Sequence, residues 1–415
     1  MILFRLTKSN RLTIPYLLSQ LEKVNIPAKN VVLCESFSRL IDMIKVSTFN
    51  HSRIKIFYSF MTPHIREVWN EIRELKRLYP EITAVAGGPH VSGDPYSGLK
   101  MGFDAVVCGE MDEGFGELVL RLDDELSGSQ GKIYITRPQL SLDHVFPFNP
   151  YFNFFPPLEI SRGCRWNCKF CQTATRSLIH RHISSTLYYL KELKNRNIFN
   201  RISFICPSAS EYGTNKSTEI NFDWLHQIFE YAVANNATFI EYGIFPSETR
   251  PNKISSEFLD LIAPYVTNKK ITVGAQSGSD ELLKKIRRAH STADIIAAAD
   301  LIHAHGFKPV LDFIIGFPGE TKEHRLETFQ LIKNLNKQFG ARIQMHYFLP
   351  LSGTDLADNI PTLLDSESKQ LLYEFYQGGV VTNWWETGMK SSWEIVDTMK
   401  MLSEVSLCNV EESIL

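Results

Sequence analysis

Three cysteines stand close together near the middle of the chain, at Cys164, Cys168 and Cys171. Their C-x3-C-x2-C spacing puts three thiolates in one short loop, where they can converge on a single inorganic centre. Thiolate is the ligand that iron–sulfur clusters prefer, and a 4Fe–4S cluster needs four ligands. Three local cysteines therefore leave one iron open to bind something else.

A structural zinc site is the main alternative, because His180 or His182 could complete a set of three cysteines and one histidine. Zinc sites more often contain C-x2-C pairs, and a C-x3-C opening is unusual for them. A disulfide scaffold fits less well, since 7 Cys in 415 residues is a sparse and odd number. The spacing favours the cluster.

The composition is that of an ordinary globular protein, with 44% hydrophobic and 22% charged residues and a formal net charge of -2. Nothing in it points to a general nucleic-acid or membrane-surface binder. The apolar run at the N-terminus is too short for a signal peptide, and a charged residue follows it too soon. No apolar run approaches the roughly 20 residues of a membrane helix. We expect a cytoplasmic protein of two or three domains.

Residues 1–126 alternate short apolar runs with amphipathic stretches, which predicts an α/β domain with a doubly wound, Rossmann-like parallel sheet. We expect its strands at 1–6, 30–34, 54–60, 83–86 and 105–108. Ligands of such sheets bind outside the carboxyl ends of the strands. The candidate ligand-binding residues at those ends are Ser59, Thr62, Gly87, Gly88, Pro89, His90, Gly109 and Glu110.

Residues 127–156 are rich in proline and aromatic residues and are predicted to be a linker. Six further strand–helix units at 157–350 predict a partial (β/α)6 barrel, with chemistry at the carboxyl ends of its strands. We expect those strands at 158–160, 202–206, 238–242, 271–275, 310–315 and 343–348. Residues 351–415 are predicted to form a helical cap, in which Trp384 or Trp385 could close a substrate pocket.

The cysteine loop, with Phe170 before its last cysteine, closely resembles the signature of the radical S-adenosylmethionine (SAM) enzymes. The resemblance implies that the open iron chelates the amino and carboxylate groups of SAM. A low-potential electron donor such as flavodoxin or ferredoxin would then supply the electron that cleaves SAM to methionine and a 5′-deoxyadenosyl radical.

Two later segments also resemble this superfamily, around the fourth and fifth barrel strands. There the resemblance implies that Gln276, Ser277 and Ser279 reach the ribose or methionine part of SAM, that Arg288 pairs with its carboxylate, and that the backbone at Gly316 approaches the adenine. The Gly-Gly-Glu segment of many relatives is replaced by Pro207-Ser208-Ala209-Ser210-Glu211, where Ser208 or Ser210 could bind the amino group. Glu241 and Arg250 are further polar candidates without a ranking, and Cys206 is either a substrate-facing thiol or a core residue.

Placed ahead of this loop, residues 1–126 resemble the cobalamin-binding domain of one large subgroup of radical enzymes. The segment Thr7–Thr13 lacks the Asp and His of the D-x-H-x-x-G motif whose histidine binds cobalt. If cobalamin binds, we predict a lower face without a protein imidazole from this position. His64 and His90 would lie in loops near the corrin or its nucleotide tail.

Together these resemblances imply a cobalamin-dependent radical SAM methyltransferase, with a 4Fe–4S cluster, SAM and cobalamin as cofactors. Its substrate would be a peptide, a protein or a small natural product, methylated at an unactivated carbon. A cyclisation or rearrangement enzyme and a methylthiotransferase are the enzymatic alternatives. The methylthiotransferase is disfavoured because only Cys34 and Cys108 are available for a second cluster in the first domain. A cobalamin or zinc sensor is the non-enzymatic alternative.

Overall fold

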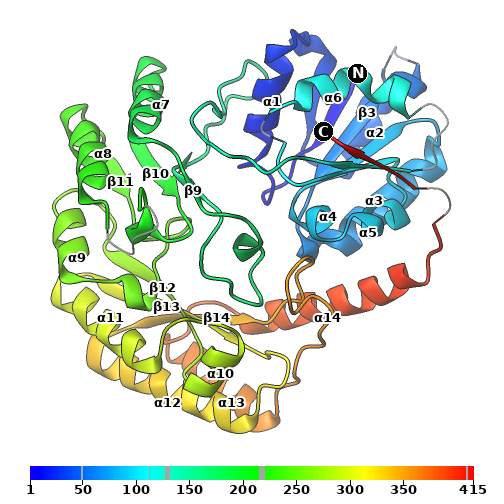
Figure 1. Ribbon diagram of the computed structural model, residues 1–415. Coiled ribbons are helices and arrows are strands. Elements are labelled where there is room, and N and C mark those ends of the chain that lie inside the picture. Colours follow the sequence, from blue (N-terminus) through cyan, green and yellow to red (C-terminus); the bar gives the residue numbers. More distant parts are fainter. Residues whose placement is uncertain (48–49, 112, 127–130, 215–219, 408–409) are drawn as a thin grey trace.

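The first part of the computed structural model is a seven-stranded sheet with strand order β15-β6-β5-β4-β3-β1-β2 (Figure 1). Every neighbouring pair in it is parallel. The structure describes residues 1–47, 50–111, 113–126, 131–214, 220–407 and 410–415. The strands of this sheet are β1 (Ile2–Arg5), β2 (Val31–Cys34), β3 (Lys55–Ser59), β4 (Thr83–Gly87), β5 (Ala105–Cys108), β6 (Lys132–Ile135) and β15 (Glu411–Ile414).

Helices cover both faces of this sheet. One face carries α1 (Ile14–Lys23) and α6 (Phe115–Glu125). The other carries α2 (Phe37–Lys45), α3 (Ile65–Leu78), α4 (Pro89–Gly93) and α5 (Pro95–Met101).

Burial on both faces explains why the central strands contain so few polar residues. All four residues of β1 are buried, as are the first four of β3. In α3, Val68, Ile72 and Leu75 recur at helical spacing and pack toward the sheet. The predicted doubly wound α/β domain is therefore confirmed.

The second part is a partial barrel of six parallel strands in two three-stranded sheets. A bridge between Thr249 and Val273 joins the two sheets. Its strands are β7 (Leu158–Glu159), β10 (Arg201–Ile205), β11 (Phe239–Glu241), β12 (Lys270–Gln276), β13 (Lys308–Ile315) and β14 (Arg342–Tyr347). Its helices are α7 (Ile183–Asn195), α8 (Phe222–Ala234), α9 (Ser256–Ile262), α10 (Asp280–Lys285), α11 (Thr292–Ala304) and α12 (Lys322–Phe339).

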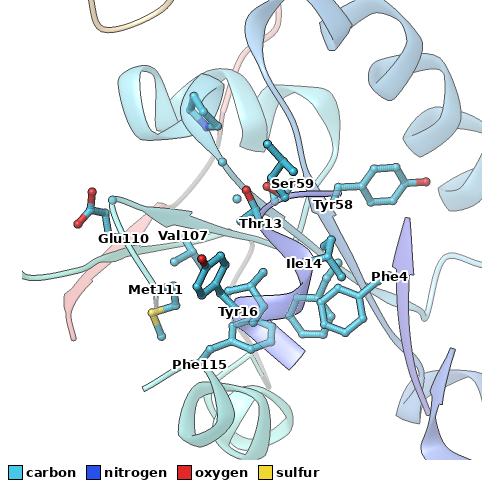
Figure 2. A pocket seen from close by; sticks show the side chains of 18 of the residues that line it. Phe4, Thr13, Ile14, Tyr16, Tyr58, Ser59, Val107, Glu110, Met111 and Phe115 are labelled. Atoms are coloured by element: carbon cyan, nitrogen blue, oxygen red, sulfur yellow. The ribbon is translucent and has the colours of Figure 1, made fainter. Parts of the chain in front are cut away.

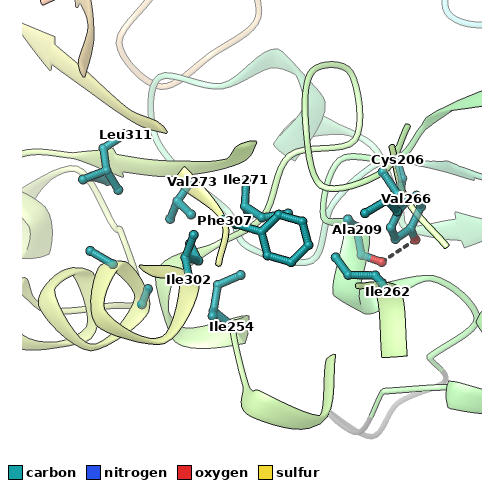
Figure 3. Close-up of a cluster of buried hydrophobic side chains, with 14 of the residues drawn as sticks. Cys206, Ala209, Ile254, Ile262, Val266, Ile271, Val273, Ile302, Phe307 and Leu311 are labelled. Atoms are coloured by element: carbon teal, nitrogen blue, oxygen red, sulfur yellow. Dashed lines mark hydrogen bonds between the residues drawn. The ribbon is translucent and has the colours of Figure 1, made fainter. Parts of the chain in front are cut away.

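The barrel core lies between the strands and these helices, and Figure 3 shows part of it, with Ile271, Val273 and Leu311 among its members. Cys206 belongs to this core. It is 1% exposed, its Sγ donates to the carbonyl of Ser208 at 3.1 Å, and burial raises its pKa to about 12. This burial and this hydrogen bond fit the interpretation of Cys206 as a core residue.

Two strands of the first sheet appear where none was expected. The predicted linker at 127–156 contains β6, which pairs with β5 at the sheet edge. The C-terminal region contains the expected helices α13 (Ser366–Gln377) and α14 (Trp385–Ser403), but it ends in β15, which pairs with β6. The domain boundaries at 126, 156 and 350 stay predictions.

The helix α14 connects the two parts of the molecule. It contacts β14 of the barrel and also α3 and α5 of the first sheet (Figure 1). Trp385 is 2% exposed at the start of this helix, and Trp384 packs on Tyr373 and Tyr376 of α13. Among the described residues, no helix combines the length and the apolar character needed to span a bilayer.

Candidate active site

The cysteine loop projects from a short antiparallel hairpin formed by β8 (Ser161–Arg162) and β9 (Ile179–His180). Gly163 starts the loop with φ +75°, and a Cβ there would collide with the backbone of Ser177. The N–H of Cys164 donates to the carbonyl of Arg176 at 3.2 Å, which closes the base of the loop. The loop is thus held in one conformation by its own backbone.

The three cysteines lie close enough to influence one another. Burial raises the pKa of the Cys164 thiol, the backbone N–H of Trp166 lowers it, and Cys171 and Cys168 raise it again. The N–H of Cys171 donates to the carbonyl of Cys168 at 3.2 Å. None of the six described cysteines forms a disulfide.

A single zinc ion needs its donors around one point, whereas each thiolate of a 4Fe–4S cluster binds a different iron. Within the described part of the chain, no group of three or more His, Cys, Asp or Glu side chains is arranged to hold one metal ion. His180, a predicted zinc candidate, instead bonds Ser161 Oγ at 2.7 Å and the Thr214 carbonyl at 3.0 Å.

Two arginines approach the middle cysteine. Arg288 Nη1 lies 3.4 Å from Cys168 Sγ, and Arg250 Nη1 lies 3.9 Å from the same sulfur. Arg250 is 4% exposed and stacks on the ring of Trp166 at 4.2 Å. Burial and the neighbouring Arg288 lower the pKa of Arg250 to about 10. Two cations beside one thiol suit a site that will hold anionic sulfur.

Several buried polar atoms of these arginines and of the segment after β10 lack a hydrogen-bond partner. They are Arg250 Nε and Nη2, Arg288 Nε, Ser208 Oγ, Ser210 Oγ and Glu211 Oε1. Buried polar atoms are ordinarily paired, so these groups are available to a ligand or to water. Glu211 Oε1 also lies 3.6 Å from Arg165 Nε. The mixture of guanidinium, carboxylate and hydroxyl groups matches an amino acid, whose ammonium and carboxylate need both kinds of partner.

Glu211 is a site residue that the sequence analysis did not assign. Its Oε2 accepts from Trp166 Nε1 at 2.8 Å, so the indole holds the carboxylate beside the cysteine loop. The acidic residue after the second barrel strand was the available sequence signal, because relatives place a glutamate in that region. Glu241, the other acidic candidate, forms an exposed ion pair with Arg201 at 2.8 Å.

The predicted residues after β12 divide into two groups. Gln276 has φ +75° at a bulge, and a Cβ on Gly274 would lie 2.7 Å from its Nε2 and 3.2 Å from Arg288 Nη2. Gln276 and Arg288 therefore lie together. Ser277 Oγ, in contrast, contacts Thr328 Oγ1 at 3.4 Å and accepts from the Ser279 N–H at 3.1 Å, and both serines are buried.

The backbone at Gly316 is fixed by the glutamate four residues later. Its φ is +79°, and a Cβ there would lie 2.6 Å from the ring of Tyr347. Its N–H donates to Glu320 Oε2 at 2.6 Å. Burial of Glu320 raises the pKa of its carboxyl to about 7, despite the nearby Arg325. The carbonyl of Gly316 accepts from the Thr362 N–H at 2.9 Å, so Gly316 is buried at the end of β13 with both of its backbone polar groups paired.

A second cavity lies at the carboxyl ends of the first sheet (Figure 2). It encloses about 1050 Å³ not filled by atoms, including its open mouth. Its apolar walls include Phe4, Ile14, Phe57, Val107 and Phe115, and its predicted residues are Ser59, Gly87, Gly88, Pro89, Gly109 and Glu110. No histidine is among the described residues that line it.

The glycines at this cavity are required by the backbone. Gly88 has φ +95°, and a Cβ there would lie 2.7 Å from the N of Phe60. Gly109 has φ +96°, and a Cβ there would collide with Thr136 Oγ1. Chain turns of this kind leave a low rim at the strand ends, over which a large flat ligand can lie.

The far wall of this cavity comes from the barrel part of the chain, through Glu159, Arg162, Arg176 and Ile205. Glu110 joins the two parts, with carboxylate oxygens 3.3 Å from Arg162 Nη1 and 3.3 Å from Arg176 Nη1. Both arginines flank the cysteine loop. The cavity therefore lies between the first sheet and the base of the cysteine loop.

Thr62, His90 and His64 do not line this cavity. Thr62 and His90 are 1% and 0% exposed and bond to each other at 3.2 Å in the contact between the two parts of the molecule. His64 lines a separate polar pocket on the α3 side of the sheet. Strand-end position alone did not reveal which face of the sheet each side chain would meet.

Residues 158–332 match the Radical SAM superfamily. An uncharacterised protein of Methanocaldococcus jannaschii is 25% identical over 331 residues, covering 74% of this chain and 69% of that protein. A threonylcarbamoyladenosine tRNA methylthiotransferase of Treponema pallidum is 28% identical over 182 residues, covering 43% of this chain and 36% of that enzyme.

Two solved structures share the fold. The methyltransferase TsrM of Kitasatospora setae, with tryptophan substrate and a SAM analogue bound, has a TM-score of 0.60 at 16% identity, covering 86% of this chain and 75% of that one. The cobalamin-dependent SAM radical enzyme OxsB, with aqua-cobalamin bound, has a TM-score of 0.58 at 15% identity, covering 98% and 62%. At these identities the likeness is one of fold.

Proposed function

We propose that this chain, a radical SAM enzyme through its superfamily domain at 158–332, is a cobalamin-dependent methyltransferase acting on an unactivated carbon. The predicted superfamily and fold class are confirmed. The observation that carries the proposal is the cavity between the carboxyl edge of the first sheet and the base of the cysteine loop. A corrin in that cavity and a cluster on the loop would face the same space.

The cysteine loop fits a 4Fe–4S cluster held by Cys164, Cys168 and Cys171, with SAM on the open iron. When bound, cluster and SAM supply a 5′-deoxyadenosyl radical, and cobalamin supplies the methyl group that replaces hydrogen on the substrate. The chain's own part is to bind, orient and exclude water.

The unpartnered groups assign roles around SAM. Arg250 and Arg288 carry free N–H groups for its carboxylate, and Glu211 Oε1, which lies 3.6 Å from Arg165 Nε, is an acceptor for its ammonium. Ser208 or Ser210 is the second acceptor, as the sequence predicted. Gln276 lies beside Arg288, and the turn at Gly316, which is buried in this structure, is the proposed neighbour of the adenine. Ser277 and Ser279 support this turn from behind.

The cavity at the carboxyl ends of the first sheet fits a corrin on three grounds. Apolar walls suit the ring and the nucleotide base, glycine turns keep the rim low, and Glu110, Arg162 and Arg176 offer polar partners for the amide side chains. The segment Thr7–Thr13 contributes Thr13 and Leu12 to the lining instead of a histidine. We therefore propose a cobalt without a protein imidazole on its lower face.

A methylthiotransferase is the second candidate, because relatives of that kind match part of the chain. Such enzymes need cysteines for a second cluster in the first domain. Here Cys34 in β2 and Cys108 in β5 are separated by three strands, or about 19 Å at 4.8 Å per strand. Both are buried, and burial raises the pKa of each to about 11. They cannot share one cluster.

The proposal is tested by anaerobic purification from cells supplied with hydroxocobalamin, followed by reaction with SAM, a low-potential reductant and candidate substrates. Peptides, proteins and small natural products are the first substrates to try, in the cytoplasmic setting that the sequence predicts. Mass spectrometry should show 5′-deoxyadenosine together with a product heavier by one methyl group. A Cys168→Ala variant should release neither. Deoxyadenosine without a methylated product would favour cyclisation or rearrangement, and a methylthio gain would favour the second candidate.

A further inference from the structure

The residue directly after the last cluster cysteine reaches across to the first sheet. Gln172 Nε2 donates to the carbonyl of Pro89 at 3.2 Å and to the carbonyl of Ser352 at 2.9 Å. Pro89 lines the cavity at the first sheet, and Ser352 lies in the segment after β14. One side-chain amide therefore joins the cysteine loop, the cavity rim and the end of the barrel.

Behind this amide lies a buried hydrogen-bond network in which each hydroxyl or N–H group donates one hydrogen bond. Ser352 Oγ donates to the carbonyl of His90 at 2.6 Å, and the Ser352 N–H donates to Thr62 Oγ1 at 3.2 Å. Ser97 Oγ donates to the Asp94 carbonyl at 2.7 Å, so it accepts from His90 Nε2 at 2.9 Å. Thr62 then donates to His90 Nδ1.

Because each polar side chain in this network has hydrogen-bond partners, the network is rigid. His90, Thr62 and Ser352 are 0%, 1% and 6% exposed, so water does not compete for their bonds. Burial lowers the pKa of His90 to about 4, which keeps the ring neutral and the tautomer fixed near neutral pH.

The two backbones touch directly beside the network. A Cβ on Gly93 would lie 2.5 Å from the N of Gly353, and a Cβ on Gly353 would lie 2.7 Å from the Cα of Gly93. Gly353 also has φ +75°. Any side chain at either glycine would drive the first sheet and the barrel apart.

We propose that this junction, made of Gln172, Ser352, His90, Thr62 and the Gly93–Gly353 contact, sets the distance between the corrin and the cluster. It rests on the function proposed above. Gln172 is a positioning residue: it is neither a cluster ligand nor part of the cavity lining, but it ties the cluster loop to the rim that supports the corrin. A shift of about 1 Å at reacting groups can cost on the order of a hundredfold in rate, which explains the need for a fixed spacing.

The test uses Gln172→Glu in the full chain, loaded with iron, sulfide and hydroxocobalamin and then reduced. The change keeps the shape of the side chain, removes both N–H donors and places a carboxylate against two carbonyl oxygens. Gln330→Glu, on the exposed face of α12, is the matched control. Gly93→Ala is an independent variant that inserts a methyl group into the same junction.

The readouts are iron and cobalamin content, 5′-deoxyadenosine release, and the cob(II)alamin–cluster distance from pulsed EPR. We expect Gln172→Glu and Gly93→Ala to keep both cofactors and to cleave SAM within about threefold of wild type, but with a longer or broader distance distribution. Gln330→Glu should match wild type.

An unchanged, narrow distance distribution in both junction variants would overturn the inference, as would loss of cobalamin from both, which would make the junction a binding element. The proposed function fails separately, in the wild-type protein, if that protein binds cobalamin and shows the distance but methylates nothing.

Discussion

At the scale of single residues, the least expected feature is the pair of arginines on one cysteine sulfur. Arg250 is buried with free N–H groups, and Arg288 lies closer to Cys168. A buried cation without a full set of partners destabilises the empty protein. Such a group persists where a ligand completes its bonds.

Arg250→Met should separate stability from ligand binding. The variant removes a buried charge, so the protein without cofactors should unfold at an equal or higher temperature. It also removes charge-assisted hydrogen bonds worth about 1.5–3 kcal/mol, so SAM should bind the cluster-loaded protein about tenfold or more weakly. Calorimetry and equilibrium dialysis measure the two effects. Arg77→Met, at an exposed ion pair on α3, is the control. Unchanged SAM affinity would remove Arg250 from the site.

Glu320 predicts a pH dependence of stability. Burial raises the pKa of its carboxyl from 4.5 to about 7, so the folded protein binds one more proton than the unfolded chain between these values. Stability contributed by this group is therefore greatest at low pH and is lost as the pH rises through that window. A shift of this size corresponds to about 3 kcal/mol.

Glu320→Gln keeps an acceptor for the Gly316 N–H but cannot ionise. Thermal unfolding at pH 5 and pH 8 should show a smaller loss of stability with rising pH in the variant than in wild type. Glu248, whose pKa burial and Asp312 raise to about 7, retains its own contribution in both proteins. Equal pH profiles would contradict the assigned protonation of Glu320.

At the scale of elements, the loops after the strands of the first sheet decide the shape of the corrin cavity. Gly88→Ala tests this. Its φ of +95° and the 2.7 Å approach to Phe60 N combine backbone strain with a collision. Gly306→Ala is the matched control, because Gly306 has φ +77° with nothing within 4 Å of its Cβ position.

The control should lose about 1 kcal/mol of stability from backbone strain alone. Gly88→Ala should lose more, and it should also retain less cobalamin after gel filtration, measured by absorbance against protein. If the two variants lose the same stability and Gly88→Ala keeps its cobalamin, the loop does not shape the cavity.

Helices and strands could be predicted where the pattern of apolar residues within one segment determines them. Expected strands such as 54–60 and 310–315 lie within two residues of β3 and β13, because largely buried strands are dominated by apolar residues. The strands β6 and β15 were missed because their pairing joins segments far apart in the chain. The cysteine loop was identified from spacing alone. Arg250 was an unranked candidate, and Glu211 and Gln172 were not identified, since their roles depend on side chains meeting from separate elements.

At the scale of the whole molecule, the C-terminal segment holds the first sheet and the barrel together. The helix α14 spans both parts, and β15 adds a strand to the exposed edge of β6. Glu411 pairs with Lys132 at 3.2 Å, and Tyr96 donates to Glu412 at 2.6 Å. Surface contacts of this kind add little, so the backbone pairing is the main contribution.

Deletion of residues 410–415 should therefore lower the unfolding temperature of the first domain, leave the iron content unchanged and reduce cobalamin retention. The double variant Glu411→Gln/Glu412→Gln keeps the strand and should behave as wild type. Differential scanning calorimetry with metal analysis checks both. Loss of iron on deletion would show that the strand supports the barrel instead.

The central claim is that a cluster with one open iron and a corrin share one cavity. EPR of the reduced, cobalamin-loaded protein tests it most directly, recorded before and after addition of SAM. We predict about four irons and one cobalamin per chain, a cluster signal that SAM changes, and a cob(II)alamin signal that the nearby cluster broadens. A cluster signal indifferent to SAM, or a protein that keeps its cluster but retains no cobalamin, would contradict the account.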